Sequence, residues 1–390
     1  MARPTISLKI DPKALRAAID ARKMSMTDLA TALGVERATL HGWVSKGSIP
    51  PNRLSSLARS LSLTGAEVES FKPRKQIDVR FRTLRNLEVE TGIVNQVTDL
   101  ARTVFRLEEH FGAPHIDSYK KLPKVGYEHP RNVAEFLLKQ FQLPSYPLSL
   151  EQLTRALLVR GIPVVFLPFW EEVRAAKVKA FTAYQDRLGL IFIDSNSAFE
   201  DVPWLIIHEL THIVKNDGGH VTAAEEKFCN QVAIEVCTPS EFFDSRKDEL
   251  RNLLTGVSLP AAVNIVREIA DLLGASFRGV VLRAKDAGIF DSKSGVCRYL
   301  MTAARNSESR RVLISDLICP KNTDDACDWD ALLKDPSKGY LMHLQALVRD
   351  GLFQGKISQG KAAEMLGIDE SVIAALYERW MPAEDDSAPL

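Results

Sequence analysis

The sequence predicts an α+β protein that is mostly helical and consists of three parts. Three observations support this: apolar residues recur at helical spacing over most of the chain, two short β-branched runs lie in its middle, and its front end is basic. The expected parts are a five-helix N-terminal domain over 1–72, a domain with a small sheet over 76–245, and a mostly helical C-terminal region over 246–390. A length of 390 residues suits two or three domains.

Charge is spread unevenly along the chain. Residues 1–75 contain 13 Lys or Arg against 6 Asp or Glu, whereas the whole chain contains 50 of each kind. The remainder of the chain is therefore acidic. This asymmetry predicts that the N-terminal domain alone meets a polyanion.

The N-terminal domain contains a pattern of two short helices joined by a turn at Gly34, within residues 25–47. The start of the second helix is where a recognition helix contacts base edges. The candidate DNA-contacting residues there are Glu36, Arg37, Thr39 and His41, with Lys46 and Arg53 as phosphate contacts.

This pattern resembles the XRE (Cro/repressor-like) helix-turn-helix over about residues 12–68. The matching residues are Leu29-Ala30, Gly34-Val35, Thr39-Leu40 and Trp43. The resemblance implies DNA as a partner and a possible homodimer, since such domains bind paired half-sites. A small helical bundle that binds protein is the alternative, because the basic excess is modest.

In the middle of the chain, residues 162–168 and 188–194 are predicted to form strands, because they are short, apolar and β-branched. Helices are predicted over 202–214 and 223–236, and again over 258–290 and 340–380. A further strand-like piece is expected at 311–314.

The first of these helices contains His208-Glu209-x-x-His212. Residues four apart lie on one helix face, so both imidazoles can reach one metal ion, and the glutamate can polarise a metal-bound water. Catalytic zinc needs a third protein ligand, for which Glu226 is the choice and Glu225 the alternative. His220 is a further candidate ligand or substrate-binding residue. The competing interpretation is two solvated histidines on an ordinary helix.

Residues 95–245 resemble the ImmA/IrrE family of metallopeptidases. The resemblance rests on Glu209-Leu-Thr-His-Ile-Val-Lys-Asn216, followed by Glu226-x-x-Cys-Asn-x-x-Ala233 and Pro239. It implies that His208, His212 and Glu226 bind Zn²⁺, that Glu209 is catalytic, and that the substrate is a helix-turn-helix repressor. Departures from the family pattern occur at Thr211, Cys229, Val232 and Cys237-Thr238. They touch no proposed ligand but bear on substrate range.

The cysteines, the apolar runs and the C-terminal segment indicate the cellular location and the number of DNA-binding segments. Five cysteines without CxxC spacing indicate reduced thiols, and no apolar run is long enough to span a membrane, so a cytoplasmic protein is expected. Segment 357–380 has a rhythm similar to the N-terminal pattern, but its acidic residues favour a packing or regulatory unit over a second DNA reader.

The sequence therefore predicts a zinc-dependent endopeptidase with a DNA-binding domain, which acts in transcriptional, stress or prophage regulation by cleaving a repressor. The alternative is a DNA-binding regulator or an antitoxin whose metal site is not catalytic.

Overall fold

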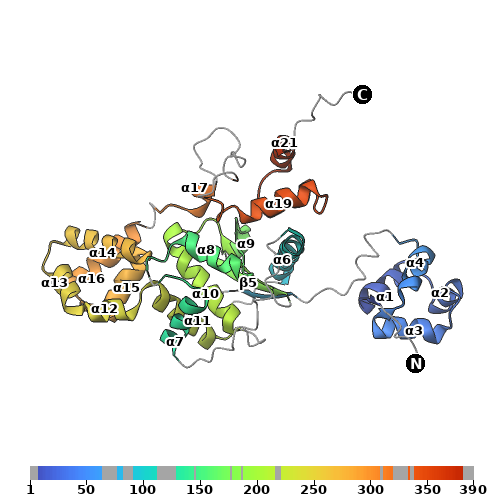
Figure 1. Ribbon diagram of the computed structural model, residues 1–390, viewed down its shortest axis with the longest axis horizontal. Coiled ribbons are helices and arrows are strands. Elements are labelled where there is room, and N and C mark those ends of the chain that lie inside the picture. The colour runs from blue at the N-terminus through green and yellow to red at the C-terminus, as the bar shows by residue number, and fades with distance from the viewer. Residues whose placement is uncertain are drawn as a thin grey trace. The chain divides into compact units, whose positions relative to one another are not determined.

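The computed structural model (Figure 1) divides into two compact units, Met1–Gln76 and Ile77–Leu390. The structure describes residues 8–63, 77–81, 91–111, 129–144, 146–175, 178–185, 188–215, 221–307, 311–318, 333 and 338–380. Within this part of the chain, no helix combines the length and the apolar character that a membrane span needs.

The first unit is a small helical bundle. Its elements are β1 (Leu8–Lys9), α1 (Pro12–Ala21), α2 (Met26–Ala32), α3 (Arg37–Lys46), β2 (Ser48–Ile49) and α4 (Pro51–Ser60). The side chain of Ser25 caps α2, and Gly34 turns the chain toward α3 with a φ of 62°, which a side chain would strain. Four helices lie within residues 8–63, whereas five were expected over 1–72, and residues 64–72 of that range lie outside the described residues.

The second unit contains a four-stranded sheet in the order β3-β5-β6-β4. The strands are β3 (Ile77–Phe81), β4 (Val164–Leu167), β5 (Ala180–Gln185) and β6 (Leu188–Asp194). β6 pairs antiparallel with β5 and parallel with β4, and β3 pairs antiparallel with β5. The structure confirms the predicted strands in 162–168 and 188–194.

Helices cover both faces of this sheet, because successive strand residues alternate between two cores. Ile191 and Ile193 belong to one core, with residues of α7, α8, α10 and α11. Leu190 and Phe192 belong to the other, with residues of α6 and α19–α21. The covering helices are α6 (Thr91–Phe111), α7 (Pro130–Gln140), α8 (Leu150–Val159), α9 (Glu171–Ala175), α10 (Val202–Lys215), α11 (Ala223–Cys237), α17 (Ile314–Ile318), α19 (His343–Phe353), α20 (Gln359–Leu366) and α21 (Glu370–Trp380). A short 3₁₀ turn, Phe199–Asp201, precedes α10.

The region 246–390 contributes to two different bodies rather than one. Helices α13 (Lys247–Thr255), α14 (Leu259–Leu273), α15 (Phe277–Asp286) and α16 (Gly295–Ser307), together with the preceding α12 (Ser240–Ser245), enclose a core of their own. Helices α19–α21 instead return to the sheet. There Gly367 lies so close to Pro168 that a Cβ atom would sit 2.4 Å from the proline Cγ. The C-terminal segment is thus packed against the unit that contains the sheet.

Three strand assignments differ from the prediction. β3 and β5 were not predicted. β3 is a single short run beside segments with helical periodicity, and β5 is rich in small and polar residues, which lowers its strand propensity. The strand expected at 311–314 is reduced to one isolated bridge between Leu313 and Ala198, after which the chain enters α17. The expected mostly helical architecture with a small sheet is confirmed.

Candidate metal centre

Two histidines four residues apart lie on the face of α10 that meets α11. His208 and His212 are 0% and 2% exposed, because α10 is apolar along its length and is buried between the sheet and α11. Trp204, one turn earlier, lies beside the His208 ring at 5.6 Å between ring centroids. The i, i+4 spacing brings the two Nε2 atoms to 3.1 Å from one another.

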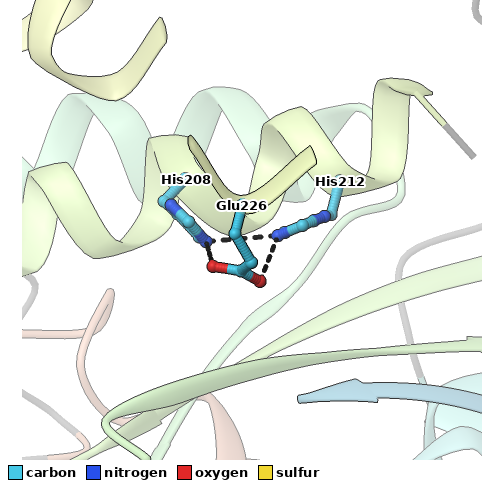
Figure 2. A group of neighbouring side chains, drawn as sticks. All are labelled: His208, His212 and Glu226. Carbon is cyan, nitrogen blue, oxygen red and sulfur yellow. Dashed lines mark hydrogen bonds and ion pairs between the residues drawn. The ribbon is translucent and has the colours of Figure 1, made fainter. Parts of the chain in front are cut away.

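The third member of the cluster comes from α11. The Thr222 side chain caps this helix by accepting a hydrogen bond from the backbone of Glu225, and Glu226 follows in the first turn. Figure 2 shows the Glu226 carboxylate between the two imidazoles. Its Oε2 lies 3.5 Å from His208 Nε2, and its Oε1 lies 3.3 Å from His212 Nε2.

These distances suit a small metal cation. Ligands at about 2.1 Å in tetrahedral geometry around zinc lie about 3.4 Å from one another. The two imidazole nitrogens are 3.1 Å apart, and the two oxygens of Glu226 lie 3.5 Å from the nitrogen of His208 and 3.3 Å from that of His212, so each separation is near this value. Two imidazoles and one carboxylate are the three protein ligands of a catalytic zinc site. His208, His212 and Glu226 can therefore hold a metal ion.

Glu225, the alternative third ligand, lies on the other side of the His212 ring. Its Oε1 is 2.9 Å from Nδ1 of His212, whereas the nitrogen that faces Glu226 is Nε2. This arrangement assigns Glu226 to the metal-facing position. Glu225 instead lies within hydrogen-bond distance of the opposite ring nitrogen, where carboxylates commonly lie behind a metal-binding histidine.

The electrostatics of the cluster favour positive charge at its centre. Burial by itself would raise the pKa of Glu226, but hydrogen bonds and charge from His208 and His212 lower it from 4.5 to about 2. Burial would lower the pKa of His212, but contacts with Cys229 and two glutamates raise it well above 6.5. Either protons on the imidazoles or a metal cation between the ligands supplies that charge.

Glu209, the predicted catalytic glutamate, is fully buried and points toward the sheet. The hydroxyl of Thr182, in β5, donates a hydrogen bond of 2.8 Å to its Oε2. This contact fixes the orientation of the carboxylate. Thr182 was missed in the sequence because it lies 27 residues away in a strand that was not predicted.

Two more residues beside the cluster were also missed. The buried Lys215 Nζ lies 3.7 Å from Glu225 Oε2, and the thiol of Cys229 lies 3.6 Å from His212 Nδ1. Burial raises the pKa of that thiol, although His212 opposes the shift, so it stays protonated. Cys229, Cys237 and Cys297 are free and buried, while Cys319 and Cys327 lie outside the described residues. His220 also lies outside them.

In the first unit, the candidate DNA-contacting side chains of α3 and its N-terminal flank are exposed. They are Glu36, Arg37, Thr39, His41 and Lys46. Leu40 and Val44 of the same helix face the core, so α3 presents a polar face to solvent. A hollow of about 500 Å³ on this face is lined by residues that include Thr39, Trp43 and Lys46.

Arg53, the other expected phosphate contact, makes a contact within the first unit. Its guanidinium donates a hydrogen bond of 3.2 Å to the carbonyl of Leu33, at the C-terminal end of α2. The side chain therefore satisfies a carbonyl that the helix leaves without an intrahelical donor.

No family model matches this chain, and neither the curated proteins nor the solved structures contain a match to it.

Proposed function

We propose that this protein is a zinc-dependent endopeptidase that carries a DNA-binding helix-turn-helix unit. The observation that supports this most strongly is the spacing of His208, His212 and Glu226, whose facing atoms lie 3.1–3.5 Å apart. Two histidines and one glutamate are a ligand set of catalytic zinc sites, which keep one position for water. The donor set and the spacing together favour zinc.

In this proposal the three ligands hold the ion and Glu209 performs the proton transfers. When bound by His208, His212 and Glu226, zinc would supply Lewis acidity, which would lower the pKa of a water to about 7 and polarise the scissile carbonyl. Glu209 accepts the proton of the attacking water and then delivers it to the leaving amine. Thr182 holds one carboxylate oxygen of Glu209, which orients the other oxygen for this transfer. Burial of both side chains limits competing bulk water.

The substrate class is proposed from the resemblance to the ImmA/IrrE family. A helix-turn-helix repressor is the proposed substrate, and cleavage would relieve repression. The first unit would bring the peptidase to DNA where such repressors bind. A second copy of the chain is the expected partner on a paired half-site.

The zinc content of the purified protein tests this proposal first. We expect about one zinc per chain in the wild type, and loss of that zinc in His212→Ala, since two remaining ligands bind zinc weakly. Glu209→Gln should retain the zinc but lose cleavage of a candidate repressor followed by mass spectrometry. Wild-type protein that stays zinc-free after zinc is supplied would remove the peptidase proposal. Cleavage by Glu209→Gln at the wild-type rate would remove the role of Glu209.

A DNA-binding regulator with a non-catalytic metal site is the second candidate, and the exposed face of α3 supports it. We expect Lys46→Ala to weaken binding to mixed-sequence duplex DNA and to reduce the salt slope by about 1, since one phosphate contact is lost. Fluorescence anisotropy over a salt series measures this. Arg59→Ala is the matched control, because Arg59 is also exposed but lies on α4. Equal effects of both substitutions would show a diffuse charge effect instead of recognition by α3.

A further inference from the structure

Behind the metal-facing histidine, three ionisable side chains lie in a buried row. Glu225 Oε1 is 2.9 Å from His212 Nδ1, and Glu225 Oε2 is 3.7 Å from Lys215 Nζ. The exposed fractions of Lys215 and Glu225 are only 2% and 4%. Lys215 is the last residue of α10 and Glu225 lies in the first turn of α11, so the row joins the two helices that supply the ligands.

Burial of this row is costly unless its charges compensate one another. Removing an ammonium or a carboxylate from water costs several kcal/mol per ion, and only a close partner of opposite charge offsets this. Lysine usually keeps its charged end in water, so a lysine buried at a helix terminus indicates a partner that holds it. Here one such partner is the carboxylate that also contacts His212.

The geometry also distinguishes the two nitrogens of His212. A neutral imidazole carries its proton on one nitrogen and a lone pair on the other. A carboxylate at Nδ1 holds the proton there, which leaves the lone pair of Nε2 directed at the position between His208 and Glu226. The thiol of Cys229 is more distant from Nδ1, at 3.6 Å, so Glu225 is the closer partner.

We propose that Glu225 and Lys215 are positioning residues for the metal site: Glu225 fixes the tautomer and ring orientation of His212, and Lys215 holds Glu225 in place while balancing its charge. The inference rests on the proposed binding of a metal at His208, His212 and Glu226. In this proposal Lys215 acts on the metal site through Glu225. It follows that loss of Lys215 has little further effect once Glu225 is gone.

Zinc affinity, measured by competition with a chromophoric chelator, tests this role without reference to cleavage. We expect Glu225→Ala to weaken zinc binding by about 10–100-fold, the usual effect of removing a carboxylate behind a metal-binding histidine. Glu225→Gln should weaken it less, because the amide oxygen can still accept the Nδ1 proton. Lys215→Met should weaken zinc binding in the wild type and change it little in Glu225→Ala.

A matched control lies on the same helix. Glu235 of α11 pairs with Arg283 of α15, and both are largely buried, but neither contacts the metal cluster. Glu235→Gln should lower the stability of the metal-free fold and leave the zinc affinity unchanged. Cobalt substitution adds a spectroscopic readout, since a rotated His212 changes the visible absorption of the bound ion.

The outcomes separate this inference from the proposed function. Wild-type zinc binding with an unchanged affinity in Glu225→Ala would overturn the positioning role and leave the zinc site standing. Additive losses in the double variant would overturn the dependence of Lys215 on Glu225. Loss of affinity in Glu235→Gln as large as in Glu225→Ala would show that general destabilisation explains both. A wild type that binds no zinc overturns the proposed function itself, and the inference with it.

Discussion

Two carboxylates on α11 have a depressed pKa, yet their partners differ in kind. Glu226, near the start of the helix, faces two histidines, and its pKa falls to about 2. Glu235, near the end, accepts hydrogen bonds from Ser240 and Arg283, which lower its pKa despite burial. An arginine is always charged, whereas a histidine is charged only when protonated. A depressed pKa by itself therefore does not identify a functional site. The Glu226 site differs because its two histidines are neutral unless a proton or a metal cation binds, whereas Arg283 beside Glu235 is always charged.

The largest expected difference between the Glu226 and Glu235 sites is in how a chelator changes the free energy of unfolding. If zinc occupies the first site at about a thousand times its Kd, its removal should lower the free energy of unfolding by about 4 kcal/mol. Protein with Glu235→Gln should lose as much free energy of unfolding on chelation as the wild type, because Glu235 is not one of the proposed metal ligands. His212→Ala protein should show no response. Thermal unfolding with and without chelator measures this, and an equal response in all three proteins would end the distinction.

A smaller effect is expected when the arginine partner is left without its carboxylate. Glu235→Gln should reduce the free energy of unfolding by about 1–3 kcal/mol, since a largely buried guanidinium loses its charged acceptor. The folded pKa of Glu235 is depressed, so its contribution is present above the ordinary value of 4.5 and is lost as the pH falls through the folded value. Urea unfolding should show the deficit at neutral pH but not in acid. A deficit that is independent of pH would contradict the charge-based account.

The smallest expected effect is the pH dependence of stability that arises from the metal cluster. In the metal-free protein, the raised pKa of His212 gives stability that is present below 6.5 and is lost as the pH rises through the raised value. The depressed pKa of Glu226 gives stability that is present above 4.5 and is lost as the pH falls toward 2. Chelated protein should therefore be most stable at mildly acidic pH. Zinc-loaded protein should instead gain stability as the pH rises toward 6.5 and keep it above that value, because the imidazoles must be deprotonated to bind metal.

Melting temperatures of the chelated and zinc-loaded proteins over about pH 5 to about pH 8 test this difference in pH dependence. Each proton that binds or leaves should change the free energy of unfolding by at most about 1.4 kcal/mol per pH unit. Parallel curves for the chelated and zinc-loaded proteins would show that protons and zinc do not compete at this site.

Local sequence was sufficient for the two helix–turn–helix segments. Ser25 and Ser358 each cap a helix, and Gly34 and Gly367 each end one with a φ near 60°, at 62° and 65°. These features depend on residues a few positions apart, so they can be read from the chain. Their surroundings could not be predicted in the same way. The turn at Gly34 has open space where a side chain would stand, whereas Gly367 lies against Pro168.

Part of the metal cluster could likewise be predicted from local sequence. The i, i+4 spacing of His208 and His212 is a property of one helix, and the choice of Glu226 followed from the next helix along the chain. The sequence by itself therefore predicted the three candidate metal-binding residues, the strands β4 and β6, and the helical character of most of the chain. It left Glu225 open as an alternative.

Only the tertiary structure decided what lies behind these residues. Thr182 contacts Glu209 from a strand 27 residues away, and Glu225 reaches the far nitrogen of His212 from 13 residues away. Lys215, a charged residue that a sequence pattern places in solvent, is buried against Glu225. Such contacts depend on how α10, α11 and β5 pack together, and periodicity within one element carries no information about the side chains that another element brings to it.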